Sequence, residues 1–328
     1  MDGLKTLETN APGESCSTQW LSADDGAKLF VRNWIPRPTI PPRAIVHIVH
    51  GMAEHSLRYE RLAQRLNTAG IVVWAADMRG HGRTADLSVN DAARGGLLGH
   101  CADKDAISRI AADIDALNRA IAKQYPNTPL FLLGHSWGSF LVQNYIETYR
   151  RQLAGCILSG TRGPDGLKIK AGMSLMTAFA ILYGRKGSFL AQAIANGPYS
   201  RSFKPTRTAF DWLSRDEKEV DAYISDPLCG KLCSSVFYRD LLSLLNKIHK
   251  PEALAAIKRE LPIYIFGGSK DPVGDMSNSP TALVNAYRSI GIQDLEFVLY
   301  PDARHETLNE TNREEVTENL LTWILKHC

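Results

Sequence analysis

The chain has 328 residues, with 38 lysine and arginine residues against 35 aspartate and glutamate residues, and a formal charge of +3. Hydrophobic residues make up 44% and charged residues 22%, which is typical of a globular protein and excludes a disordered or fibrous chain. A charge this close to zero, without a run of basic residues, argues against nucleic acid as a partner. The length allows two domains, or one α/β domain with an insertion.

The six cysteines are scattered, and only Cys229 and Cys233 lie close together, without the paired spacing of a structural zinc site. This pattern predicts free thiols in a reducing compartment. The first residues lack the apolar core of a signal peptide, and no run of about 18 apolar residues is present to span a bilayer. We therefore expect a cytoplasmic protein without a metal or another cofactor, and the sequence carries no signal for an oligomeric state.

Short apolar runs alternate with longer amphipathic ones, which is typical of a sheet covered by helices. A helix is expected after the first strand, capped by Ser56 and stopped by Gly70, and a second helical repeat runs from Ile107 to Ile121. Strands separated by helices of this length must mostly run parallel. The predicted strands are 44–49, 71–76, 130–133, 155–158, 263–266 and 295–300.

The alternation is interrupted between residues 162 and 248, where helical patterns occur without a convincing strand. We therefore predict a sheet-containing core in two parts, 1–161 and 249–328, with a helical cap inserted at 162–248. The name cap is used below for residues 162–248. Its most apolar part, 171–183, has basic residues on both sides and is too short to span a bilayer.

The pentapeptide Gly134-His135-Ser136-Trp137-Gly138 directly follows the predicted strand 130–133 and precedes a helical pattern. A nucleophilic serine must stand exposed at the edge of a sheet, and a sharp strand-to-helix turn flanked by small residues places it there. The pentapeptide alone arises easily by chance, but its position between strand and helix favours a catalytic nucleophile at Ser136 over an ordinary connecting loop.

Such a serine needs a histidine base, and in hydrolases built on this turn the acid and then the histidine follow the serine along the chain. His305 lies in the loop after the last predicted strand, where parallel strands deliver residues to the carboxyl edge of the sheet. His249 precedes the point where the sheet resumes, and His327 lies next to the end of the chain. His305 is therefore the predicted base.

The acid is expected at the same edge, in the loop after the strand 263–266. Asp271 is favoured because it follows that strand directly, and Asp275 is the alternative. The tetrahedral intermediate also needs backbone N–H donors, each lowering the barrier by about 3–4 kcal/mol. Trp137 at the start of a helix and Met52 in the loop after the strand 44–49 are the predicted donors, unless that loop only joins strand to helix.

Two other patterns point to different chemistry but do not fit it. His50, Glu54 and His55 lack the spacing of the zinc-binding motifs HExxH and HxxEH, so no metal is assigned to them. The segment 80–85 matches the dinucleotide-binding pattern G-x-G-x-x-A, but no second strand carrying an acid follows about 20 residues later. This segment is interpreted as a tight glycine turn at the rim of the site.

Several motifs occur here together. They are His50-Gly51 with Glu54-His55-Ser56 and Arg58-Tyr59-Glu60; Asp77-Met78-Arg79-Gly80-His81-Gly82; Gly134-His135-Ser136-Trp137-Gly138; Ser269-Lys270-Asp271; and His305-Glu306 with Leu308-Asn309-Glu310. Together they resemble the monoacylglycerol lipase and lysophospholipase branch of the α/β-hydrolases, over about residues 20 to 327. The resemblance implies a mostly parallel eight-stranded sheet flanked by helices, with an inserted helical cap. It also implies a catalytic triad and two backbone oxyanion donors at the residues predicted above.

The activity that the resemblance implies is that of a serine esterase or lipase whose small-molecule substrate is an ester of a single-chain lipid, a monoacylglycerol or a lysophospholipid. The apolar segment 171–183 agrees with this, since it could line an acyl tunnel or contact a membrane surface, although a helix buried against the sheet would look the same. The alternatives are a carboxylesterase of small soluble esters, a serine peptidase, or a ligand-binding protein without catalysis. The family usually has glycine at Ala53, often serine at Thr84, and frequently Met or Gln at Trp137, whose indole would narrow the acyl pocket.

Overall fold

Nine strands form one sheet in the computed structural model, which describes residues 4–6, 16–36, 41–149, 151–164 and 166–328. Their spatial order is β1-β2-β3-β5-β4-β6-β7-β8-β9. The strands from β5 to β9 in this order run parallel to one another. At the other edge β1, β2 and β3 are antiparallel to each other in turn, and β3 also pairs antiparallel with β5. The strands are β1 (Leu4–Thr6), β2 (Ser17–Ser22), β3 (Lys28–Trp34), β4 (Ala44–Val49), β5 (Ile71–Ala76), β6 (Leu130–His135), β7 (Gly155–Ser159), β8 (Ile263–Gly268) and β9 (Leu295–Tyr300).

All six predicted strands are present, as β4 to β9. The strands β4 to β8 are apolar runs covered on both faces of the sheet, whereas β9 at the edge is mostly half-buried. The antiparallel strands β2 and β3 were not predicted. Most of β2 is only half-buried and polar, and β3 carries the buried polar residues Arg32 and Asn33 within its apolar run. Neither strand therefore has the uniform apolar pattern of the central ones.

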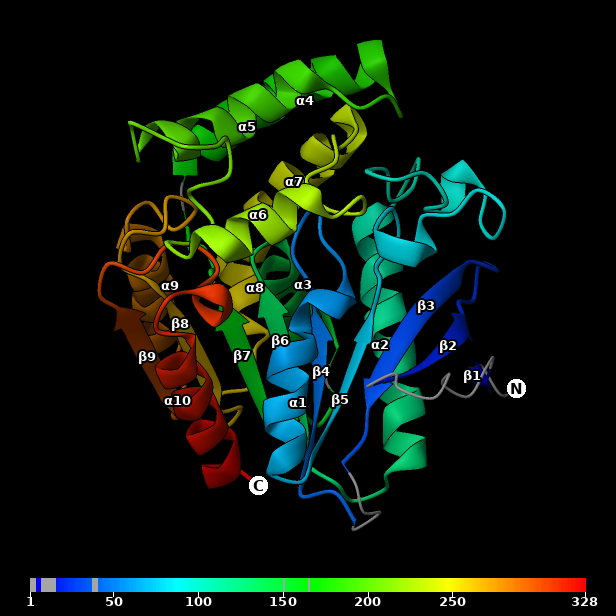
Figure 1. Ribbon diagram of the computed structural model, residues 1–328, viewed down its shortest axis with the longest axis vertical. Helices are drawn as coiled ribbons and strands as arrows, with labels where there is room; N and C mark the ends of the chain where they lie inside the picture. Colours follow the sequence, from blue (N-terminus) through cyan, green and yellow to red (C-terminus); the bar gives the residue numbers. More distant parts are fainter. Residues whose placement is uncertain (1–3, 7–15, 37–40, 150, 165) are drawn as a thin grey trace.

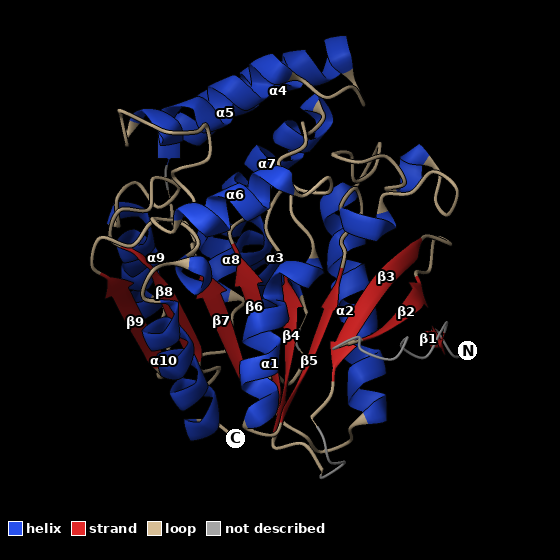
Figure 2. Ribbon diagram, viewed as in Figure 1, coloured by secondary structure: helices blue, strands red, loops and turns tan. Residues whose placement is uncertain are grey.

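Helices cover both faces of the sheet, with α1 and α10 in front of it and α2 and α3 behind it in the view of Figures 1 and 2. The α-helices are α1 (Glu60–Thr68), α2 (Ala106–Gln124), α3 (Trp137–Thr148), α4 (Gly166–Tyr183), α5 (Phe189–Arg201), α6 (Glu217–Ser225), α7 (Ser235–Ile248), α8 (Pro251–Ala255), α9 (Asn278–Ser289) and α10 (Arg313–Lys326). Short 3₁₀ helices are η1 (Ser56–Tyr59), η2 (Gly82–Thr84), η3 (Ala92–Arg94) and η4 (Thr307–Asn309).

Each face of the sheet has its own hydrophobic core. On the front face, Trp323 of α10 stacks on Tyr264 of β8, with ring centroids 5.4 Å apart. On the back face, Leu141 of α3 and Leu117 of α2 are almost fully buried. Burying a side chain of this size contributes about 1.5–3 kcal/mol, so the two cores hold the strand ends in fixed positions.

The prediction that Ser56 caps a helix by its side chain is wrong. The hydroxyl and the backbone N–H of Ser56 both donate to the buried carboxylate of Asp77, which also accepts a hydrogen bond from Arg32. Ser56 instead begins the 3₁₀ helix η1, and α1 follows at Glu60. A buried carboxylate needs several hydrogen-bond donors. The Ser56 hydroxyl therefore bonds to Asp77 and does not cap the helix.

The helices α4 to α7 lie between β7 and β8 in the chain and form a layer above the carboxyl ends of the parallel strands (Figure 1). Within the described part of residues 162–248, the structure contains no strand. Among the residues that are described, no helix is both long and apolar enough to cross a bilayer. The loops that follow β4, β6, β8 and β9 all open toward the underside of this helical layer.

Candidate active site

Ser136 lies at the turn between β6 and α3, with φ 53° and ψ −124°. A non-glycine residue with positive φ is strained by roughly 1–3 kcal/mol, and such residues occur mostly where the surrounding structure fixes them. The Ser136 N–H donates to Ser159 O at 2.9 Å, which anchors the turn to the end of β7. The turn thus holds the serine above the carboxyl edge of the sheet.

The two glycines around Ser136 are required by close backbone contacts. A Cβ atom at Gly134 would lie 2.5 Å from the carbonyl oxygen of Gly138, and one at Gly138 would lie 2.1 Å from that of Val49. Distances this short are forbidden for real side chains. The glycines therefore let α3 approach the loop after β4, which brings Met52 beside Ser136.

Asp271 and His305 are brought together as the sequence predicted: His305 Nδ1 donates to Asp271 Oδ2 at 2.9 Å, and both residues are buried. The other carboxylate oxygen of Asp271 accepts the N–H of Val273 at 2.8 Å. The alternatives lie elsewhere, since Asp275 is exposed and His327 Nε2 bonds Asp294 Oδ2 at 2.9 Å. His305 Nε2 is left as the basic nitrogen, and His305 lines the same pocket as Ser136.

The electrostatic surroundings of His305 favour a working base. Burial disfavours its charged form. The charge and the hydrogen bond of Asp271, together with the charges of Glu306 and Glu54, outweigh burial and raise the pKa of His305 above the usual 6.5. The neighbouring His135 ring packs against it at 4.9 Å, and burial together with the charge on His305 lowers the pKa of His135 to about 4. His135 is therefore neutral near neutral pH, whereas the surroundings of His305 favour its charged form.

Arg58 joins the two loops on either side of the site. Its guanidinium forms two hydrogen bonds of 2.7 Å to the Glu306 carboxylate and one of 2.8 Å to Glu54 Oε2. Glu54 lies in the loop of Met52 and also accepts the Tyr59 hydroxyl at 2.8 Å, while Glu306 directly follows His305. Sequence reasoning gave these residues no role, although the spacing of four between Glu54 and Arg58 indicates a pair.

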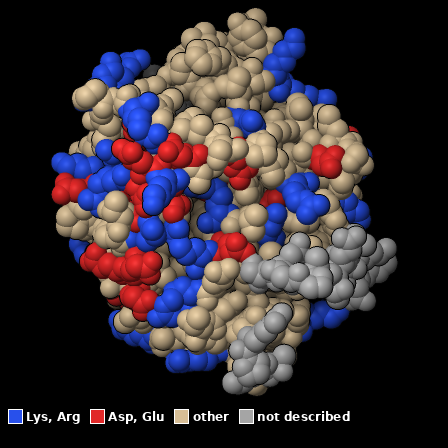
Figure 3. Space-filling view, in the orientation of Figure 1, with Lys and Arg blue, Asp and Glu red and all other residues tan. Residues whose placement is uncertain are grey.

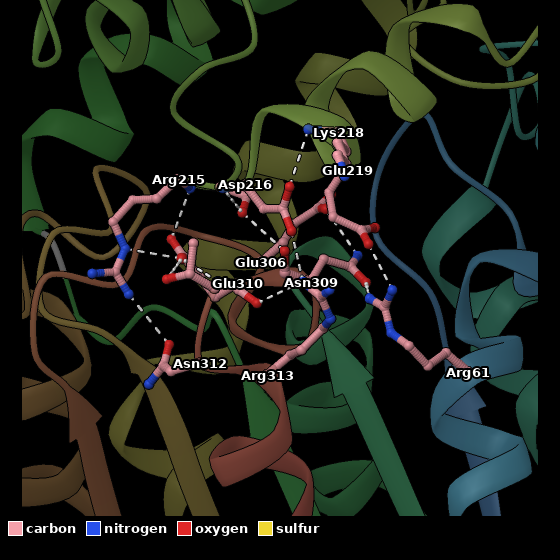
Figure 4. Close-up of polar contacts among 12 residues, drawn as sticks. Arg61, Arg215, Asp216, Lys218, Glu219, Glu306, Asn309, Glu310, Asn312 and Arg313 are labelled. Carbon is pink, nitrogen blue, oxygen red and sulfur yellow. Dashed lines mark hydrogen bonds and ion pairs between the residues drawn. The ribbon is translucent and has the colours of Figure 1, made fainter.

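A second polar network binds the middle of the cap to the segment after His305 (Figure 4). Fully buried Glu310 accepts hydrogen bonds from Arg215 Nε at 2.9 Å and from the Arg304 N–H at 2.9 Å. Asp216 accepts from Arg313 Nη1 at 2.7 Å, and Glu306 N–H donates to Leu213 O at 2.8 Å. These bonds fix this part of the cap against the segment that carries His305.

A cavity of about 400 Å³ opens at Ser136, within the size range of small-molecule sites. Its floor includes Trp137 and Phe140 of α3, and its roof includes Met176 of α4 and Leu245 of α7. A second, much smaller pocket meets Ser136 from the other side. The larger cavity is lined mainly by apolar side chains of the core and the cap, and Trp137 is one of its walls.

The bonds of Arg58 predict a large stability effect. In Arg58→Met, Glu54 and Glu306 remain buried without their cation, so the free energy of unfolding should fall by about 3–5 kcal/mol in urea denaturation. Arg65→Met removes an exposed pair with Glu318 and should cost less than about 1 kcal/mol. Equal losses in the two variants would contradict this role of Arg58.

The loss of stability in Arg58→Met should depend on pH. Arg58 contributes to lowering the pKa of both Glu54 and Glu306 in the folded protein, although burial alone would raise them. A depressed carboxyl pKa stabilises the fold above the unfolded value, about 4.5, and this stabilisation is lost as the pH falls further. The difference between Arg58→Met and wild type should therefore shrink below pH 4.5.

Comparison with known proteins identifies the family of this chain. A family model described as serine aminopeptidase, S33 (Hydrolase_4), matches residues 40–312. A monoacylglycerol lipase from Mycolicibacterium smegmatis is 30% identical over 307 residues, covering 92% of this chain and 94% of that protein. The monoglyceride lipase of Homo sapiens is 29% identical and covers 86% of this chain and 80% of that protein.

Among solved structures, a thermostable carboxyl esterase from Bacillus coagulans matches with a TM-score of 0.84 and 28% identity, over 95% of this chain and 98% of that one. The predicted α/β-hydrolase fold is thereby confirmed, with the short strand β1 added at the edge of the eight expected strands. The chain therefore belongs to the matched family of α/β-hydrolases, in the branch of the monoacylglycerol lipases.

Proposed function

We propose that this protein cleaves carboxylic esters of single-chain lipids, monoacylglycerols or lysophospholipids, through a Ser-His-Asp acyl-enzyme mechanism. Ester hydrolysis itself follows from the family. The observation that supports a lipid acyl group is the mainly apolar cavity at Ser136, whose walls come from α3, α4 and α7. An acyl chain that enters this cavity leaves water and buries its methylene groups, at about 0.8 kcal/mol each.

In the proposed reaction, His305 Nε2 takes the proton of Ser136 Oγ as this oxygen attacks the ester carbonyl carbon. The tetrahedral intermediate collapses when its C–O bond to the alcohol breaks and His305 returns the proton to the leaving oxygen. Water then loses a proton to His305 and attacks the acyl-enzyme, releasing the fatty acid and restoring Ser136. Asp271 holds the histidine in the required tautomer throughout.

The oxyanion of each intermediate is proposed to bind the backbone N–H groups of Met52 and Trp137. Trp137 is the first residue of α3, where N–H groups have no acceptor within the helix and the helix dipole favours negative charge. Met52 lies beside Ser136 at the cavity. Two such donors supply several kcal/mol of transition-state stabilisation.

One observation favours the second candidate function, a carboxylesterase of small soluble esters. The Trp137 indole packs between His81 and Phe237, at ring distances of 5.1 and 4.9 Å, and takes up part of the cavity wall. A large rigid side chain in the cavity wall would reduce the length of acyl chain that the cavity accommodates. The preferred chain length therefore separates the two functions.

We also propose that the cap contacts a membrane surface. Exposed apolar residues gather on α4 and α5, where Ile181 is 80%, Leu182 74% and Phe189 76% exposed. Figure 3 shows few charged side chains over these helices and basic side chains at their borders. Exposed apolar patches bordered by polar residues mark interaction sites, and basic borders favour an anionic lipid surface.

The activity is tested with Ser136→Ala, which should lose at least about 10³-fold in kcat on esters while its circular dichroism spectrum and Tm stay close to wild type. Wild type should release fatty acid from monoacylglycerols or lysophospholipids faster than it releases acetic or butyric acid from short-chain esters. Peptides serve as the negative control and should not be cleaved. A preference for acetyl or butyryl esters would favour the soluble carboxylesterase instead.

The role of Asp271 predicts a pH effect. In Asp271→Asn, the carboxylate that raises the pKa of His305 is gone while burial remains, so the apparent pKa of the acid limb of kcat/KM should fall. The rate itself should drop by about 10³–10⁴-fold because the tautomer is no longer fixed. Asp275→Asn, at the exposed alternative acid, should keep the rate and the pH profile of wild type.

The membrane contact is tested by flotation with vesicles containing phosphatidylglycerol. Ile181→Glu and Phe189→Glu should each weaken binding several-fold, yet retain hydrolysis of soluble short-chain esters, because neither side chain lines the cavity. Leu87→Glu changes another exposed apolar residue, 64% exposed, outside the cap and should bind as wild type does. Equal binding by all variants would exclude α4 and α5 as the contact.

A further inference from the structure

Three potential metal ligands meet beside the catalytic centre without belonging to it. His55 comes from the loop after β4, whereas Asp226 and Cys229 come from the cap segment between α6 and α7. Their ligand atoms all lie within 4.8 Å of one another. We propose that His55, Asp226 and Cys229 bind a thiophilic divalent cation such as Zn²⁺.

The donor types fit this ion. Imidazole nitrogen, carboxylate oxygen and thiolate sulfur are the three ligand classes of protein zinc sites, and three protein ligands leave a fourth position for water. His55 and Cys229 are only 3% and 4% exposed, which shields the bound ion. The side chain of Asp226 is 31% exposed and provides the route by which an ion enters.

His55 itself points to an unfilled role. Its Nε2 pairs with Asp226 Oδ2 at 2.8 Å, but its Nδ1 is buried and has no hydrogen-bond partner among the described residues. Buried polar atoms without a partner are uncommon in native structures, and each calls for an explanation. A bound ion would take one of the two ring nitrogens of His55 as its ligand atom.

The charges around Cys229 also favour a cation. Three carboxylates, those of Glu54, Asp226 and Glu306, act on the thiol, against the single guanidinium of Arg58. The same negative charge attracts a divalent cation. When the sulfur–metal bond forms, the sulfur–hydrogen bond breaks and the proton passes to solvent.

The geometry needs only a small adjustment. Metal–ligand bonds of about 2.0–2.3 Å in a tetrahedron place the ligand atoms about 3.3–3.6 Å apart. The 2.8 Å contact between His55 and Asp226 must therefore widen, and no separation, each being within 4.8 Å, has to close by more than about 1.5 Å. Asp226 is the residue that ends α6 and is partly exposed, so its carboxylate has room to turn.

An ion here would join the core to the cap. Ala53 O, next to the oxyanion donor Met52, already accepts hydrogen bonds from Gly230 N–H at 2.9 Å and from the Tyr223 hydroxyl at 3.0 Å. Both donors belong to the cap. The hydrogen bond between His55 and Asp226 is a third connection between the same two segments. The metal would take its place and tie Cys229 to His55 as well.

The test uses the full chain, treated with a chelator, desalted and kept reduced, and titrated with Co²⁺ as a spectroscopic substitute for Zn²⁺. Wild type should develop a thiolate-to-cobalt charge-transfer absorption that saturates at one ion per chain and disappears on addition of Zn²⁺. Cys229→Ser should lose this absorption. Cys233→Ser, which changes a buried cysteine of the same segment outside the cluster, should keep it.

A second variant and a second readout protect the test against misfolding. Asp226→Asn retains the thiol but not the carboxylate, so its affinity for Co²⁺ should fall at least about tenfold. Zn²⁺ should raise the Tm of wild type and of Cys233→Ser, but not that of Cys229→Ser, because binding to the folded state alone stabilises it. Absence of the charge-transfer absorption in wild type, or its persistence in Cys229→Ser, would overturn the proposal.

Discussion

The arrangement of the candidate active site depends on the ion pairs that the buried guanidinium of Arg58 forms with Glu54 and Glu306. A cation taken out of water costs several kcal/mol unless charges of opposite sign and good geometry replace its hydration. Glu54 and Glu306 provide that replacement, and they come from opposite ends of the chain. Since neither acid is stable in the interior without Arg58, the loop that carries Met52 and the loop that carries His305 must take their positions together.

The nucleophile is fixed by a constraint of a different kind, which is steric. The backbone at Ser136 is strained, and the close approach of α3 to the loop after β4 tolerates only glycine at position 138. Packing on both faces of the sheet supplies the energy that maintains this turn. Backbone contacts thus hold the turn of Ser136, and ion pairs hold the loop of His305. Both residues line the same pocket.

The sequence was sufficient for the parts of the structure that follow local rules. The central strands carry uniform apolar runs, and the chain order of serine, acid and histidine led to Asp271 and His305, which the fold brings within 2.9 Å. The edge strands β2 and β3 have mixed patterns and were missed. The partnership of Arg58 with Glu306 spans 248 residues, and no local pattern reveals a contact of that separation.

Different segments of the cap contact different parts of the site. The middle segment of the cap, around Arg215 and Asp216, is bonded to the residues after His305. The helices α4 and α5 instead supply the roof of the cavity and expose apolar side chains to the outside. The geometry of the reaction and the shape of the substrate space are therefore encoded in separate stretches of the cap. Replacement of 166–201 by another helical hairpin would change which acyl chains fit without breaking the bonds that hold the base, so in this architecture selectivity can evolve independently of catalysis.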